Sequence, residues 1–186
     1  DALHGFMKGH YSAPNIVFAA SGRVDHAEFA RLAEEAFDAL PKLRKSRREP
    51  ALYVGGEFRE SRDLEQVHLL IGMEGLAFVD PDFYAASAFS TLLGGGMSSR
   101  LFQEVREKRG LAYSIYSYLS CFSDGGLFGI YAGTGAAEVA EVVPLVFDEI
   151  AKLADDVPAD EIARARTQMK SGILMSRESI YSRCEQ

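Results

Sequence analysis

Two side chains with strong hydrogen-bond donors, Arg106 and Tyr113, lie seven positions apart in the stretch REKRGLAYSIY. Arg106 falls in the last turn of an expected helix and Tyr113 early in the strand after it, so both can face the opening where the helix meets the sheet. A guanidinium and a phenol in such a place suit an oxyanion or the main-chain carbonyl groups of a peptide. Arg109 and Tyr116 repeat the spacing, and spacing alone leaves both pairs open. The structural alternative is a solvated helix end followed by core tyrosines.

Three glycines, Gly94, Gly95 and Gly96, come just before this helix and are followed by Ser98 and Ser99. Free backbone N–H groups at a helix N-terminus can bind an anion, and glycines allow a close main-chain approach. The alternative is that the glycines only end one helix and form a hinge to the next. A nucleotide-binding phosphate loop is disfavoured, because the lysine of that motif is missing.

Other catalytic centres find no support in the residue pattern. No H-E-x-x-H or H-x-x-E-H motif is present, so we expect no metal ligands in this chain. No G-x-S-x-G motif supports a serine nucleophile, and Cys121 and Cys184 have no histidine beside them in the sequence. We interpret each histidine as a capping, surface or core residue. The four are His4, His10, His26 and His68.

Composition excludes two classes of partner. The 186 residues are 47% hydrophobic and 25% charged, as in an ordinary globular protein. The net charge of −7 opposes binding to DNA or RNA, since that affinity depends largely on basic side chains. The longest apolar run is about five residues, whereas a membrane helix needs about 18. We therefore expect no nucleic-acid partner and no membrane span.

Hydrophobic spacing and capping residues predict an α+β fold, in which helices pack on one face of a mostly antiparallel sheet. A capping pair, Asp25 and Glu28, opens one of the helices, and the sequence SDGG is typical of a hairpin turn. The predicted helices cover residues 1–11, 25–40, 80–93, 98–109, 137–154 and 158–182. The predicted strands cover residues 16–21, 52–55, a segment around Phe58, 66–73, 111–120 and 127–134.

The same pattern predicts two domains. Residues 1–40 are expected to be the C-terminal tail of a first α/β domain whose beginning is absent. Residues 41–50 hold five basic residues and two prolines, which is typical of a solvated linker. Residues 51–186 are expected to form most of a second α/β domain. The chain begins with Asp1 and not Met, so we expect a processed or excised piece.

Three stretches resemble one known family. The segment GGGMSSRLFQEVREKRGLAYSIYSYLSCFSDGGLFGIYAGT closely resembles the second-domain signature of the insulinase/pitrilysin family of zinc peptidases. The resemblance is to the branch similar to mitochondrial processing peptidase and its bacterial single-chain relatives. HYSAPNIVFAASGRVDH is similar to the end of that family's first domain, and GGEFRESRDLEQVHLLIGMEG is similar to the opening of its second.

The resemblance implies two similar α/β domains that form half of a clamshell. It also implies a zinc ion held in the first domain by H-x-x-E-H and a later glutamate, with the first glutamate acting as general base. These ligands would lie upstream of Asp1, so the chain alone should hold no zinc and be inactive. By resemblance, Arg106 and Tyr113 match the pair that contacts substrate and stabilises the tetrahedral intermediate. The triplet Gly94 to Gly96 resembles a glycine-rich loop that handles substrate in this branch, and Ser98 and Ser99 are expected to bind substrate with it.

The implied function is part of a zinc endopeptidase that hydrolyses peptides or presequences. The implied partners are a peptide substrate and a second family half, in a dimer or clamshell, and the bacterial branch implies a cytoplasmic location. The alternative is a non-catalytic partner or core-type structural subunit of the same family. A third hypothesis is an anion-binding module built on the glycines with Ser98, Ser99 and Arg100. The family's second domain would continue beyond Gln186.

Overall fold

The computed structural model describes residues 1–42 and 49–185, and the chain divides into two compact units. One unit comprises Asp1–Glu49 together with Ser171–Gln186, and the other comprises Pro50–Lys170. Most of the linker predicted at 41–50 lies outside the described residues. The domain boundaries inferred from the sequence stay a prediction.

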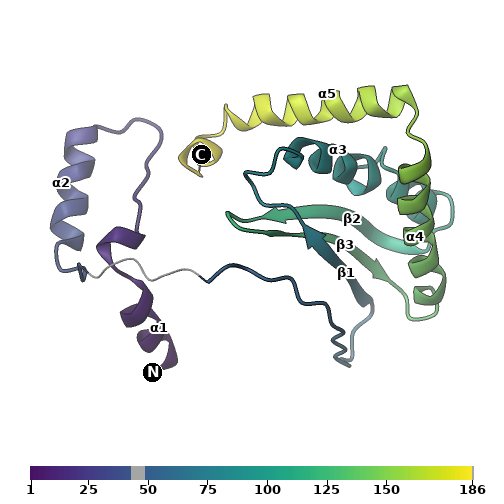
Figure 1. The fold of residues 1–186 in the computed structure, drawn as a ribbon, viewed down its shortest axis with the longest axis horizontal. Coiled ribbons are helices and arrows are strands. Elements are labelled where there is room, and N and C mark those ends of the chain that lie inside the picture. The colour runs from purple at the N-terminus through teal and green to yellow at the C-terminus, as the bar shows by residue number, and fades with distance from the viewer. Residues whose placement is uncertain (43–48, 186) are drawn as a thin grey trace. The chain divides into compact units, whose positions relative to one another are not determined.

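The larger unit is built on an antiparallel sheet (Figure 1). Its described strands are β1 (Val67–Gly75), β2 (Ala112–Cys121) and β3 (Gly126–Thr134), in the order β1-β3-β2. The predicted hairpin between β2 and β3 is confirmed, and its turn is closed by the Phe122 N–H group, which donates to the Gly125 carbonyl. The predicted α+β class is therefore confirmed.

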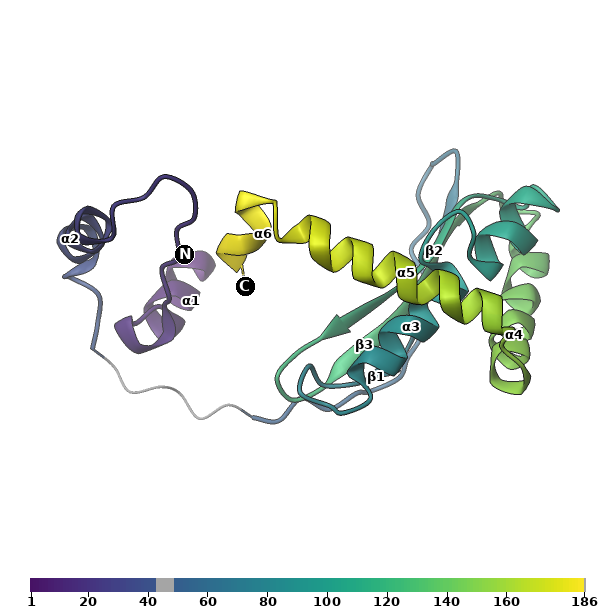
Figure 2. The same cartoon turned by 90° about the horizontal axis from the view of Figure 1, so that it is seen from above.

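The helices of this unit begin close to the predicted positions. They are α3 (Phe83–Gly94), the π-helix η2 (Phe102–Glu107), α4 (Val139–Asp155) and α5 (Ala159–Ser176). Both α3 and η2 pack against β2, and α4 packs against α3 and η2. The first part of α5 crosses over α3 (Figure 2). This arrangement places η2 and the start of β2 next to each other.

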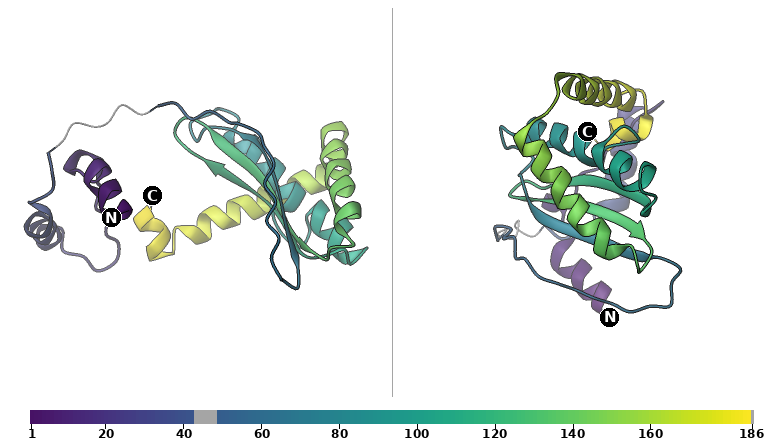
Figure 3. Two further views of the ribbon diagram at one scale, coloured as in Figure 1. Left: turned by 90° about the horizontal axis from the view of Figure 1, so that it is seen from below. Right: turned by 90° about the vertical axis from the view of Figure 1, so that its right-hand side faces the viewer.

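Alternate strand residues build the hydrophobic core, as the two-residue period of a half-buried sheet requires. The positions facing the helices are mostly apolar, and they join the buried faces of α3, η2 and α4. Ser117 of β2 is a polar exception, and its hydroxyl donates to the Ser90 carbonyl of α3. Three η2-region and α3 side chains, Leu93, Leu101 and Val105, are completely buried. The strand contributions are Leu69, Ile71, Met73, Ile115, Leu119, Phe128, Ile130 and Ala132. Two further views show the helices of this unit gathered on one side of its sheet (Figure 3).

The smaller unit contains α1 (Ala2–His10), the short helix η1 (Ala13–Asn15), α2 (His26–Phe37), the end of α5 and α6 (Ile180–Glu185). Asp25 caps α2, because its carboxylate accepts the Glu28 backbone N–H group at 2.9 Å. The reciprocal half of the predicted capping box is not formed, since the Glu28 side chain pairs with Arg31. The predicted helices at 1–11 and 25–40 are confirmed.

Three predicted strands and one long helix are wrong. Residues 16–21, 52–55 and the segment around Phe58 form no strand. A strand needs a neighbour for its backbone groups, and none of the described strands pairs with them. The segment after residue 50 instead contacts β1 through a side chain, since the Tyr53 hydroxyl donates to the Gly72 carbonyl. The helix predicted over 158–182 breaks after Ser176 and restarts at Ile180. No described helix has the length and apolarity to cross a membrane.

Candidate functional site

Arg106 lies near the end of η2, whose backbone is wider than an α-helix. The Lys108 N–H group donates to the carbonyl of Gln103, five residues earlier, which is the bond that defines a π-helix. The helix is anchored by Val105, which is completely buried, and by Leu101 just before it. Short π-helical segments occur frequently at functional sites. The anchoring leaves Arg106 on the partly exposed side of η2.

Tyr113 lies at a β-bulge at the start of β2. Ala112 pairs with Thr134 and Ser114 pairs with Gly133, so Tyr113 has no partner position on β3. A bulge of this kind re-aims a side chain and is common next to active sites. The Tyr113 side chain is accordingly exposed, at 74% of its full accessible surface.

The turn from η2 into β2 brings the arginine and the tyrosine together. Gly110 makes this turn with a φ of +65°, a conformation that favours glycine. The Arg106 guanidinium carbon lies 5.8 Å from the centroid of the Tyr113 ring and 4.7 Å from that of the Phe102 ring. Both distances are within the range of a cation–π contact. Phe102 was not among the residues predicted from the sequence, although an aromatic residue four positions before an arginine on a helix is a usable signal.

The polar ends of Arg106 and Tyr113 remain available. Within residues 1–42 and 49–185, no hydrogen bond ends on the Arg106 guanidinium or on the Tyr113 hydroxyl. The carboxylate of Glu107 lies 4.0 Å from Arg106 Nε, and both side chains are exposed. Ring contacts occupy the faces of a guanidinium and leave its N–H edge free for an acceptor. The pair can therefore offer donors to a carbonyl oxygen or an oxyanion.

The second pair with the same spacing is engaged elsewhere. The Arg109 guanidinium donates to the Glu104 carboxylate at 2.9 Å and to the Glu104 carbonyl at 2.8 Å. The Tyr116 ring stacks on the Tyr131 ring, with 5.0 Å between centroids. The geometry therefore distinguishes the two pairs that spacing alone could not. Arg109 and Tyr116 already contact other residues of the fold, whereas the polar ends of the first pair take part in no hydrogen bond among the described residues.

Glu104 forms ion pairs on the solvent side of η2. Its carboxylate accepts hydrogen bonds from Lys108 and from Arg109, and the two bonds lower the pKa of the Glu104 carboxyl, the Lys108 bond most. The Glu104 side chain is only 22% exposed, so water screens these charges less than on an open surface. This cluster fixes the end of the helix that carries Arg106.

Part of the predicted glycine loop, residues 94–99, is buried against the rest of the fold, and part is exposed. Gly94 ends α3 against β2, where a Cβ atom would clash with the backbone nitrogen of Ser117. The Ser99 side chain is buried and its hydroxyl donates to the Gly96 carbonyl at 2.6 Å. Gly95, Gly96 and Ser98 are exposed, and the Gly95 carbonyl accepts a hydrogen bond from a glutamine of α5.

The described residues do not fit a zinc site. No group of three histidine, cysteine, aspartate or glutamate side chains lies close enough to hold a metal ion anywhere in the described part of the chain. His4 and His10 lie on α1, and His26 begins α2. His68 lies on β1, where its Nδ1 atom is 2.8 Å from the Tyr131 hydroxyl.

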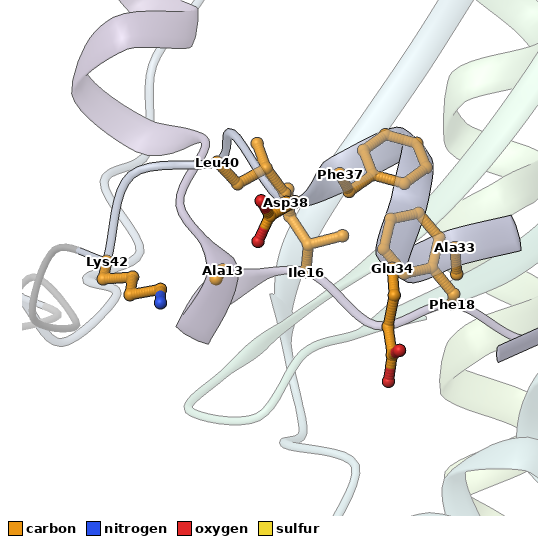
Figure 4. Close-up of a pocket in the computed structure, with 9 residues that line it drawn as sticks. All are labelled: Ala13, Ile16, Phe18, Ala33, Glu34, Phe37, Asp38, Leu40 and Lys42. Atoms are coloured by element: carbon orange, nitrogen blue, oxygen red, sulfur yellow. The ribbon is translucent and has the colours of Figure 1, made fainter. Parts of the chain in front are cut away.

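A pocket of about 350 Å³ lies in the smaller unit (Figure 4). Its lining is mostly apolar, with Glu34, Asp38 and Lys42 among the side chains that surround it. The Phe18 and Phe37 rings pack there at 4.3 Å between centroids. None of the predicted site residues lines this pocket.

Sequence comparison finds a family and named relatives. The family model described as the peptidase M16 inactive domain matches residues 1–169. An uncharacterized zinc protease of Rickettsia bellii is 40% identical over 182 residues, which cover 97% of this chain and 44% of that protein. An uncharacterized zinc protease of Streptomyces coelicolor is 41% identical over 188 residues, which cover 96% of this chain and 41% of that protein. The chain thus spans less than half the length of these relatives.

Solved structures show the same fold. A peptidase M16 inactive domain from Pseudomonas fluorescens has a TM-score of 0.61 and 30% identity, covering 80% of this chain and 37% of that chain. A chain of complex III2 from Candida albicans has a TM-score of 0.69 and 23% identity, covering 88% of this chain and 42% of that chain. The second likeness concerns the fold alone.

Proposed function

Because this chain belongs to the family of the peptidase M16 inactive domain, we propose that it supplies substrate contacts to a zinc endopeptidase that hydrolyses peptides or presequences. The observation that carries the proposal is the contact between Arg106 and Tyr113, whose polar ends have no hydrogen-bond partner in the described structure. The zinc-protease names of the relatives support the same chemistry for the longer protein.

In this proposal the pair acts on the carbonyl group that is cleaved. Both side chains present N–H or O–H donors at the edge of the helix-to-sheet opening. Donors fixed in advance stabilise a carbonyl oxygen more strongly as it gains negative charge, so they favour the transition state over the bound substrate. Zinc, held outside this chain, would supply metal-ion catalysis. This chain alone would then bind substrate without hydrolysing it.

The exposed part of the glycine loop belongs to the same proposal. Gly95, Gly96 and Ser98 would contact the peptide main chain, while Gly94 and Ser99 hold the loop in place. The chain would pair with a second family half in a clamshell or dimer. A cytoplasmic location, implied by the bacterial branch, is also part of the proposal.

The competing proposal is a non-catalytic or core-type subunit. The fold likeness to a chain of complex III2 is the reason to consider this role. A purely structural role would not require a solvent-facing arginine and tyrosine with free donors. The longer protein can be examined for H-x-x-E-H and a later glutamate, since their absence would favour this competing role.

The test compares the chain with the complete protein. We expect the complete protein to hydrolyse a fluorogenic peptide and to lose that activity with a chelator. We expect the 186-residue chain to give no turnover and to bind no stoichiometric zinc by metal analysis. Chelator-sensitive hydrolysis by the chain alone would contradict the proposal, and so would an inactive complete protein that contains zinc.

A further inference from the structure

The Arg106 guanidinium contacts two described aromatic rings, and Phe102 is the nearer of them. The guanidinium carbon lies 4.7 Å from the centroid of the Phe102 ring, closer than the 5.8 Å to the Tyr113 ring. We propose that Phe102 is a positioning residue, which holds the Arg106 guanidinium beside Tyr113 with its N–H edge directed to substrate. This inference rests on the proposed function above.

The ring of Phe102 has a fixed base. It is the first residue of η2, and its neighbour Leu101 is completely buried in the core. Val105, also completely buried, anchors the same helix just before Arg106. The Phe102 ring itself is half-buried. Because the backbone that carries the Phe102 ring is fixed by these buried neighbours, the ring gives a stable surface for the longer, more flexible arginine side chain.

Arg106 needs such a surface because its own restraints are weak. Its side chain is 40% exposed, and a long side chain loses much rotamer freedom when it is held in one place. The charged group that competes for it is Glu107, at 4.0 Å. Stacking on Phe102 restricts the guanidinium before substrate arrives, so less ordering remains to be done in the transition state.

The contact also explains why the ring should be aromatic and not merely apolar. A flat ring attracts a cation through its electron-rich face and leaves the in-plane N–H donors free. A leucine of similar volume would fill the space without that attraction. The guanidinium would then be free to swing toward Glu107 and away from Tyr113.

The kinetic test uses the complete protein and three single variants. We expect Phe102→Leu to lower kcat/KM about tenfold or more, mainly through kcat, because a misplaced donor is lost chiefly from the transition state. Phe102→Tyr should restore most of the activity. Phe122→Leu, at an exposed ring in the β2–β3 turn, is the matched control and should stay within about twofold of wild type.

A double variant separates positioning from general structure. In an Arg106→Ala background, Phe102→Leu should cause no further loss, since the side chain that it positions is gone. A further loss as large as in the wild-type background would overturn the inference. Activity of Phe102→Leu within twofold of wild type would also overturn it.

A measurement without activity keeps the inference independent of the proposed function. In NMR spectra of this chain, the Arg106 side-chain protons should be shifted upfield by the Phe102 ring. Phe102→Leu should remove that shift and Phe102→Tyr should keep it. An unchanged Arg106 spectrum in Phe102→Leu would overturn the positioning. Wild-type activity of Arg106→Ala would instead overturn the proposed function and leave the NMR shift to decide the positioning.

Discussion

Arg106 and Tyr113 meet at 5.8 Å because each lies on an irregular piece of backbone. Arg106 belongs to a π-helix, and Tyr113 lies at a bulge that removes it from the pairing of β2 with β3. Regular α-helix and β-ladder geometry would place these side chains by simple periodicity. Two irregularities on either side of one short turn are typical of a site that the fold is built to present.

The Tyr113 hydroxyl is expected to act only in the transition state. In the complete protein, Tyr113→Phe should lower kcat/KM by on the order of 100-fold, as loss of an oxyanion donor does, with KM little changed. The matched control is Tyr116→Phe, because the Tyr116 ring stacks on Tyr131 and keeps that contact without its hydroxyl. Equal effects of the two variants in a steady-state peptide assay would contradict a specific role for Tyr113.

The close packing of Gly94 against β2 predicts opposite effects for two helix glycines. Gly94→Ala should lower the free energy of unfolding by about 1–3 kcal/mol, since its Cβ would clash with the backbone of β2. Gly172→Ala in α5 meets no neighbour within 4 Å and should raise it by about 0.5–1 kcal/mol. Urea unfolding followed by circular dichroism measures both. A change of the same sign in the free energy of unfolding for both variants would contradict the close packing of Gly94 against β2.

The parts of the fold that could be predicted from the sequence are those set by interactions between residues close together in the chain. The Asp25 cap and the β2–β3 hairpin are set by neighbouring residues, and the sequence predicted both. The predicted strand at 16–21 was wrong because a strand also needs a distant partner, which local pattern does not reveal.

The candidate site shows the same division. Spacing placed Arg106 at a helix end and Tyr113 early in a strand, and the structure agrees with both positions. Spacing could not separate this pair from Arg109 and Tyr116. That separation depends on the bonds to Glu104 and on stacking with Tyr131, which only the packed fold defines.

Glu104 predicts how the stability of the fold changes in acid. Its carboxyl pKa is lowered on folding from an ordinary value of 4.5, chiefly by the hydrogen bond from Lys108. The stability that it contributes is therefore fully present above its unfolded pKa and is lost as the pH falls through the lower folded value. Wild type should be more stable than Glu104→Gln at about pH 7, and the difference should shrink toward about pH 3. Urea unfolding at several pH values would contradict this if the difference stayed constant.

The most direct test of the central claim is the rate of peptide hydrolysis by the complete protein carrying Arg106→Ala. We predict a fall in kcat/KM of on the order of 100-fold, with zinc content and folding unchanged, because the proposal has the metal held outside this chain and because the arginine lies on the surface. A rate within about twofold of wild type, at full zinc occupancy, would contradict the claim that this chain supplies donors to the reacting carbonyl group.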